Sequence, residues 1–375
     1  TNNNPSIGLA ASGTGNIPSF TAINTGSTMV TANITVTPTA AGCPGTPKSF
    51  TIRVNPTPNV VRPADQTLCN NAVTNAVGFS SSVTGTIFVW TNNNPSIGLA
   101  ATGNGNIPAF TAVNTGTVPV TATITVTATA TGCSGNPESF TITVNPTPNI
   151  NQPANQSLCN GSVTTAIAFA GAVSNTAFAW NNNNPSIGLA ASGNGNIPSF
   201  TAINTGNTPV NAAITVTASA AGCTGSPVVF NIAVHPTVNV NQPANQTLCN
   251  SNATNAVNFT GNISNTIYNW TNTEPSIGLA ASGTGNIQSF IATNNGSSAV
   301  TAAITVTPLM AGCPGTPETF TIAVNPSPNV APPADQNLCN GATTNAIAFT
   351  GSLAGTAYNW TNNNTSIGLT ANGNG

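Results

Sequence analysis

The residues with the clearest chemical potential in this chain are its eight cysteines, which fall at alternating short and long spacings along the whole sequence. No two of them form a CxxC pair, and the chain has one histidine, so a zinc site or a thioredoxin-type redox motif is not favoured. An even, periodic set of cysteines in an exported protein is typical of disulfide bonds. The set consists of Cys43, Cys69, Cys133, Cys159, Cys223, Cys249, Cys313 and Cys339.

Charged residues are almost absent from the chain. Three Lys+Arg and five Asp+Glu make 2% of 375 residues, against about 25% in a typical domain. Three basic residues cannot neutralise a run of phosphates, which excludes nucleic acid as a partner. The carboxylates are scattered and do not recur in every repeat, so neither acid/base catalysis nor a repeated calcium site is expected. We therefore predict a protein that is not an enzyme and carries no cofactor or metal; its acidic residues are Asp65, Glu138, Glu274, Glu318 and Asp335.

The location of the protein can be predicted from what the sequence lacks. No stretch approaches the roughly 18 consecutive apolar residues of a membrane helix. The sequence opens at Thr1 without a signal peptide or an initiating Met. We expect a piece of a mature exported protein, secreted or on the cell surface, with no membrane span in this segment.

An internal repeat organises the whole chain. TNNNPSIGLA begins at Thr1 and at Thr91, and close copies begin at Asn181, Thr271 and Thr361, which gives a period of 90 residues without insertions or deletions. This unit is too long for a solenoid repeat and has the size of a small β domain.

Within one unit, apolar and polar residues alternate as in half-buried strands. Residues 121–128 read TATITVTA, and Phe140, Ile142 and Val144 continue the pattern after a Gly/Pro-rich turn, which predicts a hairpin. Shorter strands are expected at 76–79, 86–90, 97–100 and 107–112. The fold class is therefore all-β, with tandem immunoglobulin-like sandwiches in a linear rod.

Prolines mark the expected domain boundaries, because proline donates no hydrogen bond and suits a passage between sheets. VNPTPN or a near copy occurs once per unit. We predict complete domains at 56–145, 146–235 and 236–325. A C-terminal part-domain at 1–55 and an N-terminal part-domain at 326–375 flank them.

These domain boundaries favour disulfides inside each sandwich. They pair Cys69 with Cys133, Cys159 with Cys223, and Cys249 with Cys313. Cys43 and Cys339 then lose their partners to the truncated ends. This pairing requires residues 60–66 to be mostly a lead-in. If the first strand instead runs at full length up to Cys69, its sulfur lies at the opposite end from Cys133, and the bond joins neighbouring domains.

Other recurring residues are assigned structural roles. Trp90, Trp180, Trp270 and Trp360 each follow an aromatic residue at a spacing of two, which indicates the core face of a central strand more than a sugar-stacking platform. GTGNIP and GNGNIP lack the third glycine and the helix of a dinucleotide loop, and we interpret them as hairpin turns. His235 stands where other repeats have Asn.

The motifs TNNNPSIGLAASGTGNIPSF, AAGCPGTP and PANQTLCN closely resemble the PKD-like, immunoglobulin-like repeats of giant surface proteins of gliding, type IX-secreting bacteria. The resemblance covers the entire chain. It implies β-sandwich spacers in adhesins or cell-surface fibres and carries no catalytic residue onto this sequence. An acidic turn after the Trp strand, part of the PKD pattern, is replaced here by Thr-Asn-Asn-Asn.

The expected surface is uncharged and rich in Thr and Asn, and it lacks the charges that usually protect sheet edges. We expect the chain to be a structural protein whose rods self-associate into a fibre or lateral bundle. In the alternative, the Thr rows form an adhesive face that recognises a surface polysaccharide or ice.

Overall fold

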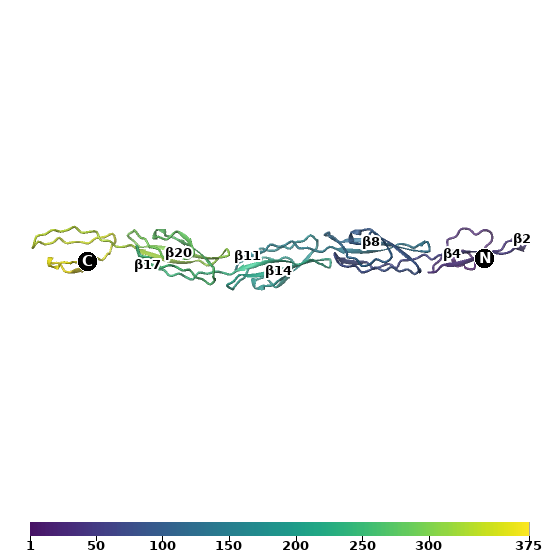
Figure 1. Cartoon of the computed structure of the whole chain (residues 1–375), viewed down its shortest axis with the longest axis horizontal. Helices are drawn as coiled ribbons and strands as arrows, with labels where there is room; N and C mark the ends of the chain where they lie inside the picture. The colour runs from purple at the N-terminus through teal and green to yellow at the C-terminus, as the bar shows by residue number, and fades with distance from the viewer. Residues whose placement is uncertain (375) are drawn as a thin grey trace.

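In a computed structural model, which describes residues 1–374, the chain forms one row of β units with its two ends at opposite ends of the row (Figure 1). Gly375, the last residue of the predicted part-domain 326–375, lies outside the described residues. The predicted fold class, tandem β-sandwiches of about 90 residues, is confirmed by the sheets.

Three six-stranded sheets follow one another along the row, and each takes its strands from one 90-residue unit. The first has the order β5-β10-β8-β6-β7, with β9 paired to β8, and the other two repeat this order. The first sheet consists of β5 (Gln66–Cys69), β6 (Ile87–Asn92), β7 (Thr102–Asn104), β8 (Val120–Ala130), β9 (Cys133–Ser134) and β10 (Glu138–Asn145). The second consists of β11 (Gln156–Cys159), β12 (Ala177–Asn182), β13 (Ser192–Asn194), β14 (Val210–Ala220), β15 (Cys223–Thr224) and β16 (Val228–His235). The third consists of β17 (Gln246–Cys249), β18 (Ile267–Asn272), β19 (Ser282–Thr284), β20 (Val300–Met310), β21 (Cys313–Pro314) and β22 (Glu318–Asn325).

The two part-domains hold fewer pairings. At the N-terminal end β1 (Val30–Val36) pairs with β4 (Lys48–Val54), and β2 (Thr39–Ala40) pairs with β3 (Cys43–Pro44). At the C-terminal end β23 (Asn359–Thr361) pairs with β24 (Asn372–Asn374). Short 3-10 helices occur at η1 (Pro5–Ile7), η2 (Pro95–Ile97), η3 (Pro185–Ile187), η4 (Pro275–Ile277) and η5 (Thr365–Ile367).

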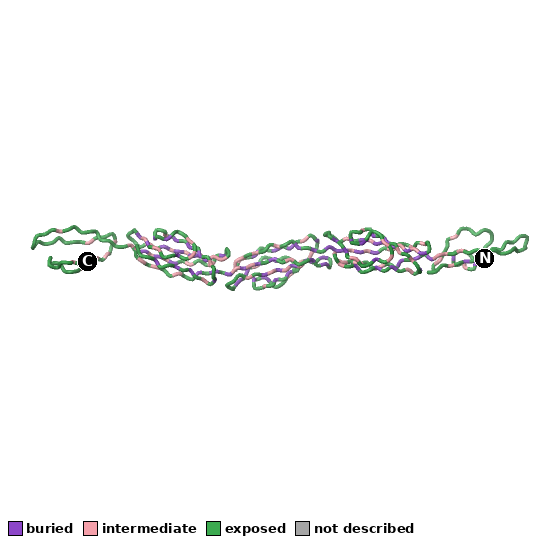
Figure 2. Tube along the Cα trace, viewed as in Figure 1, coloured by how far each residue is buried: buried purple, intermediate pink, exposed green. Residues whose placement is uncertain are grey.

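The long strand β8 shows the predicted alternation. Its residues Ala122, Ile124 and Val126 are fully buried, while the threonines between them lie on the outer face. On that face Thr121 and Thr143 share a hydrogen bond of 2.9 Å across the strand pair. The burial pattern repeats in β14 and β20, and Figure 2 shows the buried residues concentrated in the three central units.

The second layer of each sandwich is less regular than predicted. Residues 76–79 and 107–112, expected as strands, are joined by the single isolated bridge Val77↔Ile107, and a second bridge joins Thr111 to Val73, outside the expected strand. Residues 97–100 begin at the end of η2, because Pro95 starts a 3-10 turn that the Asn94 side chain caps. These segments still contribute residues to the core, since Val77 is 6% exposed and Ile107 is 1% exposed.

The four tryptophans differ between complete and partial domains. Trp90, Trp180 and Trp270 are 5–7% exposed and belong to the three cores. Trp360, also predicted for a core, is only partly buried. The part-domain lacks the counterparts of β8 and β10 that cover the other three.

The glycine motif forms more than a turn, which corrects the hairpin-turn interpretation. Its first residues belong to the edge strand β7, and Gly103 pairs with Trp90 across β6 and β7. A Cβ on Gly103 would overlap the indole ring at Cζ2 and Cε2. The turn itself comes at Gly105, whose φ is +67°. Glycine is therefore needed here for close approach to an aromatic ring.

We expect Gly103→Ala to destabilise domain 56–145 by about 2–3 kcal/mol, because the indole must move out of a packed core. Urea unfolding followed by Trp fluorescence measures this effect. Gly78→Ala is the matched control in the same domain, since a Cβ there meets no atom within 4 Å. Equal stability of the two variants would contradict the packing interpretation.

Candidate functional site: the disulfide-linked domain junctions

Two disulfide bonds connect consecutive sheets of the row. Cys69 at the end of β5 is bonded to Cys223 at the start of β15, with a Cα–Cα distance of 5.6 Å. Cys159 at the end of β11 is bonded to Cys313 at the start of β21, with a Cα–Cα distance of 5.5 Å. Both bonds span 154 residues. Each junction between complete domains is therefore closed by the peptide linker and by one covalent cross-link.

The predicted pairings Cys69–Cys133, Cys159–Cys223 and Cys249–Cys313 are wrong. β5 runs parallel to β10, and its last residue, Cys69, is in register with Asn145 at the C-terminal end of the domain. Cys133 is the first residue of β9, directly after the β8–β9 turn and before β10 begins. The eight residues of β10 span roughly 25 Å at about 3.3 Å per residue, far beyond the reach of a disulfide. The alternative is right that the bond joins neighbouring domains, although the strand that ends at Cys69 has only four residues and residues 60–65 are a lead-in without strand structure.

Four cysteines of residues 1–374 are free: Cys43, Cys133, Cys249 and Cys339. Cys43 and Cys339 were predicted to be unpaired, whereas Cys133 and Cys249 were not. Cys133 is free because it is the counterpart of Cys223 at a junction where the part-domain 1–55 has no counterpart of β5. Cys249 is free because the part-domain 326–375 has no counterpart of the β14–β15 turn.

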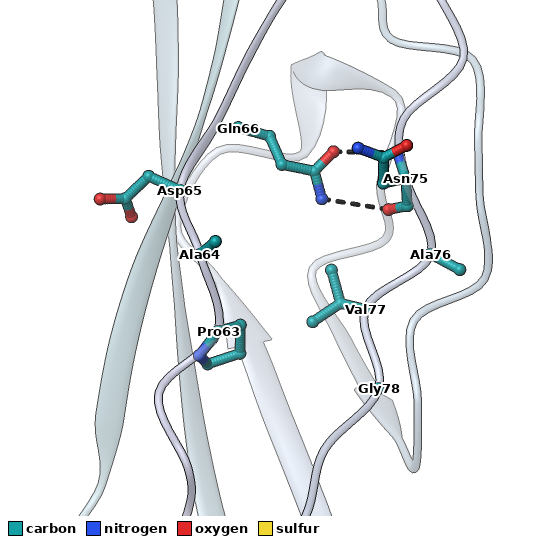
Figure 3. Close-up of a pocket in the computed structure, with 8 residues that line it drawn as sticks. All are labelled: Pro63, Ala64, Asp65, Gln66, Asn75, Ala76, Val77 and Gly78. Atoms are coloured by element: carbon teal, nitrogen blue, oxygen red, sulfur yellow. Dashed lines mark hydrogen bonds between the residues drawn. The ribbon is translucent and has the colours of Figure 1, made fainter.

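A glutamine holds the strand that carries each bonded cysteine. Gln66, three residues before Cys69, donates from Nε2 to the Asn75 carbonyl (3.0 Å) and accepts at Oε1 from the Asn75 N–H (2.9 Å) (Figure 3). The side-chain amide thus makes the same pair of hydrogen bonds that the backbone of a neighbouring strand would make. It lies in a surface hollow lined by residues 63–66 and 75–78, and both its polar groups are used. The same pair of bonds recurs at Gln156, Gln246 and Gln336.

At two linkers an asparagine contacts the next domain. Asn145 Nδ2 donates to the Ala221 carbonyl (3.0 Å), in the same β14–β15 turn that presents Cys223. Asn55 makes the corresponding bond to Thr131 (3.1 Å). Asn145 is 7% exposed. The linkers after Asn55 and Asn145 thus combine buried prolines with a hydrogen bond to the next domain, and the two junctions between complete domains add the disulfide.

The junction between 146–235 and 236–325 departs from this pattern at His235. Its Nε2 shares a hydrogen bond with Ser157 Oγ (3.0 Å), and its Nδ1 is buried without a partner. The imidazole does not reach the turn carbonyl of the next domain as Asn145 does.

We expect His235→Asn to stabilise the array by about 1 kcal/mol, because the amide can donate to the Ala311 carbonyl and the unpartnered nitrogen disappears. Thermal unfolding of the oxidised chain measures the change. The reciprocal variant Asn145→His serves as the control and should destabilise its junction by a similar amount. A destabilising His235→Asn or a stabilising Asn145→His would contradict the proposed role of the amide.

The single ion pair among the described residues supports the lead-in to β5 in domain 56–145. Asp65 contacts Arg62 (2.9 Å) and accepts a 2.7 Å hydrogen bond from the Thr141 N–H. In the next two domains the neutral residues Asn155 and Asn245 accept the same backbone bond. Arg62 Nε donates to Ser139, and Gln152 and Gln242 donate to the corresponding carbonyls. In these two domains, amide side chains make the hydrogen bonds that Arg62 and Asp65 make in domain 56–145.

This difference predicts an acid sensitivity confined to one domain. The Thr141 N–H and then Arg62 hold the pKa of Asp65 below its ordinary value of 3.8. A carboxyl with a lowered folded pKa stabilises the domain above its unfolded pKa, and this contribution is lost as the pH falls through the folded value. Urea unfolding at pH 7 and pH 3 should show domain 56–145 weakened in acid. Asp65→Asn should remove that difference, and an unchanged acid dependence would contradict the assignment.

Residues 1–374 contain neither a metal-binding cluster nor a membrane-spanning helix. No group of three His, Cys, Asp or Glu side chains lies close enough to hold a metal ion. No helix there has the length and apolar character needed to span a membrane.

One unit of the chain matches a known protein family. A family model described as the PKD-like domain matches residues 66–148, from β5 to the linker after β10. Residues 66–148 thus resemble a PKD-like domain, and they form one of the β-sandwich units that repeat along the chain. The match covers one repeat, and the 90-residue period extends the pattern to the others. No curated protein matches the chain.

Solved structures similar to the array are multi-domain chains. The titin domains I67–I69 in an E-to-A variant share 9% identity, with a TM-score of 0.41 over 72% of this chain and 98% of theirs. The human desmocollin-1 ectodomain shares 10% identity, with a TM-score of 0.31 over 88% and 74%. Mouse cadherin-23 EC22–24 shares 10% identity, with a TM-score of 0.32 over 72% and 99%.

Proposed function

We propose that the chain is a non-enzymatic, extracellular structural rod, the repeat tract of a cell-surface fibre or adhesin stalk. The observation that carries the proposal is the covalent closure of consecutive junctions by Cys69–Cys223 and Cys159–Cys313. A disulfide inside one domain would stabilise that domain alone. A disulfide between domains limits their relative bending and twisting, which serves a protein whose task is to hold two points apart.

The same bonds support the extracellular location, because structural disulfides persist in oxidising compartments. The near absence of charge fits a rod whose structural hydrogen bonds do not depend on salt or pH. At Asn155, Asn245, Gln152 and Gln242 the structural hydrogen bonds use neutral amides.

The outer face of each sheet supports lateral contact between rods. Rows of threonine on β8 and β10 pair with each other, as in Thr121–Thr143 and Thr125–Ser139, and present methyl groups and hydroxyls without charge. We propose that these faces self-associate in the fibre. Binding of a polysaccharide through the same rows is the alternative, and a glycan array with the whole chain separates the two.

Small-angle X-ray scattering of the oxidised and reduced chain tests the stalk function. The oxidised chain should scatter as a narrow rod with one well-defined maximum dimension, and reduction should broaden its distance distribution as the junctions bend. Equal, broad distributions in both states would show that the disulfides do not stiffen the array and would overturn the proposal.

A further inference from the structure

The two inter-domain disulfides enclose overlapping stretches of the chain. Cys69–Cys223 and Cys159–Cys313 each begin in one domain and end in the next, and the stretches that they enclose share residues 160–222. Every peptide bond between Cys69 and Cys313 is therefore bridged by at least one disulfide. A peptide bond in the shared stretch is bridged by both.

Two covalent paths consequently cross domain 146–235. The first path follows residues 146–159 and leaves through the disulfide to Cys313 in the next domain. The second path arrives through the disulfide from Cys69 in the preceding domain and follows residues 223–235 into the next linker. As long as the neighbouring domains are folded, a pull on the array is transmitted through both paths.

The two paths have matched lengths. The first contains 14 residues, 146–159, and the second contains 13, 223–235. When fully extended they reach about 50 Å and about 45 Å, a difference of one residue. A load is shared only by paths that become taut at nearly the same extension, because otherwise the shorter one carries all of it. The matched lengths therefore allow both paths to bear tension together.

The two paths also lie side by side. β11 on the first path pairs in parallel with β16 on the second, and the pairing ends with Cys159 opposite His235. Upstream of β11, the Asn231 N–H donates to the Asn155 side chain on the first path (2.7 Å). Because parallel strands are pulled in the same direction, tension along the row does not separate the two paths.

Residues 160–222 lie on neither path. They contain β12, β13 and β14, and β14 flanks the second path by pairing with β16. This segment also contains the solvent-exposed loop 205–209. Exposed loop tips of this kind are the preferred sites of proteolytic cleavage. A cut in this loop removes no link from either path.

We propose that the array is a tension-bearing tether that survives cleavage of its own backbone by an extracellular endoprotease. Hydrolysis of one peptide bond between residues 70 and 312 consumes one water, forms a carboxyl and an amino terminus, and leaves the two pieces joined by a disulfide. A cut within 160–222 leaves both load paths intact. The proposal rests on the proposed stalk function and explains why the bonds overlap: a disulfide within one domain would leave every linker unprotected.

The test needs a chain with one trypsin site at a chosen place. The chain has only three Lys+Arg, so Lys48→Gln, Arg53→Gln and Arg62→Gln give a background without a trypsin site. Into this background Asn207→Lys places one site in the exposed loop 205–209, inside both disulfides. The matched control is Ser27→Lys, which places a site in the corresponding exposed loop of the first repeat, outside both disulfides.

Trypsin is added to the oxidised variants until a reducing gel shows complete cleavage. The cleaved Asn207→Lys chain should run as one species of uncut size on a non-reducing gel, whereas the cleaved Ser27→Lys chain should separate into two fragments. In optical tweezers, at a load that the uncut chain withstands, at least tenfold more cleaved Asn207→Lys tethers than cleaved Ser27→Lys tethers should survive. Asn207→Lys tethers that part at this load would overturn the proposal.

A pair of cysteine substitutions tests the overlap itself. In a chain with Cys69→Ser and Cys223→Ser, the pieces cut at Asn207→Lys should stay joined, because the second disulfide still bridges the cut. The pieces cut at Thr117→Lys, in the corresponding exposed loop of domain 56–145, should separate in this chain and stay joined when all cysteines are present. Any other pattern would overturn the overlapping arrangement.

The failure of this proposal is distinguishable from the failure of the stalk function. If the cleaved tethers part while X-ray scattering shows that the uncut oxidised chain is a narrow rod, the second load path is absent and the stalk function stands. If the cleaved tethers hold while the uncut chain scatters as a flexible one, the array is a tether without being a stiff stalk.

Discussion

Pulled from its two ends, the oxidised chain should lengthen by only a small amount when a complete domain unfolds. Each complete domain is bypassed by a disulfide. When domain 146–235 unfolds, the load runs through residues 146–159 and crosses to Cys313 in the next domain. These 14 residues reach about 50 Å when extended, while a full 90-residue unit reaches about 300 Å. The folded domain already occupies much of the 50 Å, since the 11 residues of β14 span about 35 Å.

Optical-tweezers measurements on the oxidised and reduced chain give the two lengths directly. After reduction, each complete domain should release most of its extended length, on the order of 250 Å. The double variant Cys69→Ser with Cys223→Ser is the matched control, because it removes the bypass of domain 56–145 and leaves that of the other two. One long release and two short ones are expected from it. Three long releases from the oxidised wild-type chain would contradict the assigned bonds.

Replacing Phe230 with Ala should lower the unfolding free energy of domain 146–235 by about 3–5 kcal/mol, which is a large share of the stability of a small domain. The ring is fully buried, and its centroid lies 6.4 Å from that of Phe169. Its removal leaves a cavity between the two layers of the sandwich. Hydrogen exchange in moderate urea, followed by mass spectrometry, resolves the effect by domain.

The loss of protection should be confined to peptides of 146–235, because each domain has a separate core. Val229→Ala is the matched control: Val229 precedes Phe230 on β16, faces outward and is 49% exposed. It should change stability by less than about 1 kcal/mol. If protection fell equally in all three domains, the array would behave as one cooperative unit and the separate cores would have no thermodynamic meaning.

The sheet strands were predictable from the sequence because their pattern is local. The alternation at 121–128 follows from side chains that point to opposite faces of β8, and the turn before Phe140 marks the hairpin. The irregular second layer was harder to predict, since its segments are held by single bridges and by amide side chains such as Gln66. Such contacts depend on residues distant in the sequence and leave no period.

The disulfide pairing could not be predicted from spacing, because it depends on which end of the sheet Cys69 occupies. That position is set by the parallel pairing of β5 with β10, a contact between residues about 76 apart. One signal was present: Gln66 and Leu68 alternate directly up to Cys69, as in a strand that ends at the cysteine. The close contact of Gly103 with Trp90 was also missed, since a glycine in a polar stretch is equally typical of a turn.

The identity of the cysteine pairs tests the central claim, a rod with covalently closed junctions, most directly. Because the chain has only three Lys+Arg, the oxidised protein is digested with pepsin, whose acidic conditions also suppress thiol exchange, and the linked peptides are identified by mass spectrometry. The structure predicts Cys69 linked to Cys223 and Cys159 linked to Cys313. Cys69 linked to Cys133 and Cys159 linked to Cys223, bonds within single domains, would contradict it.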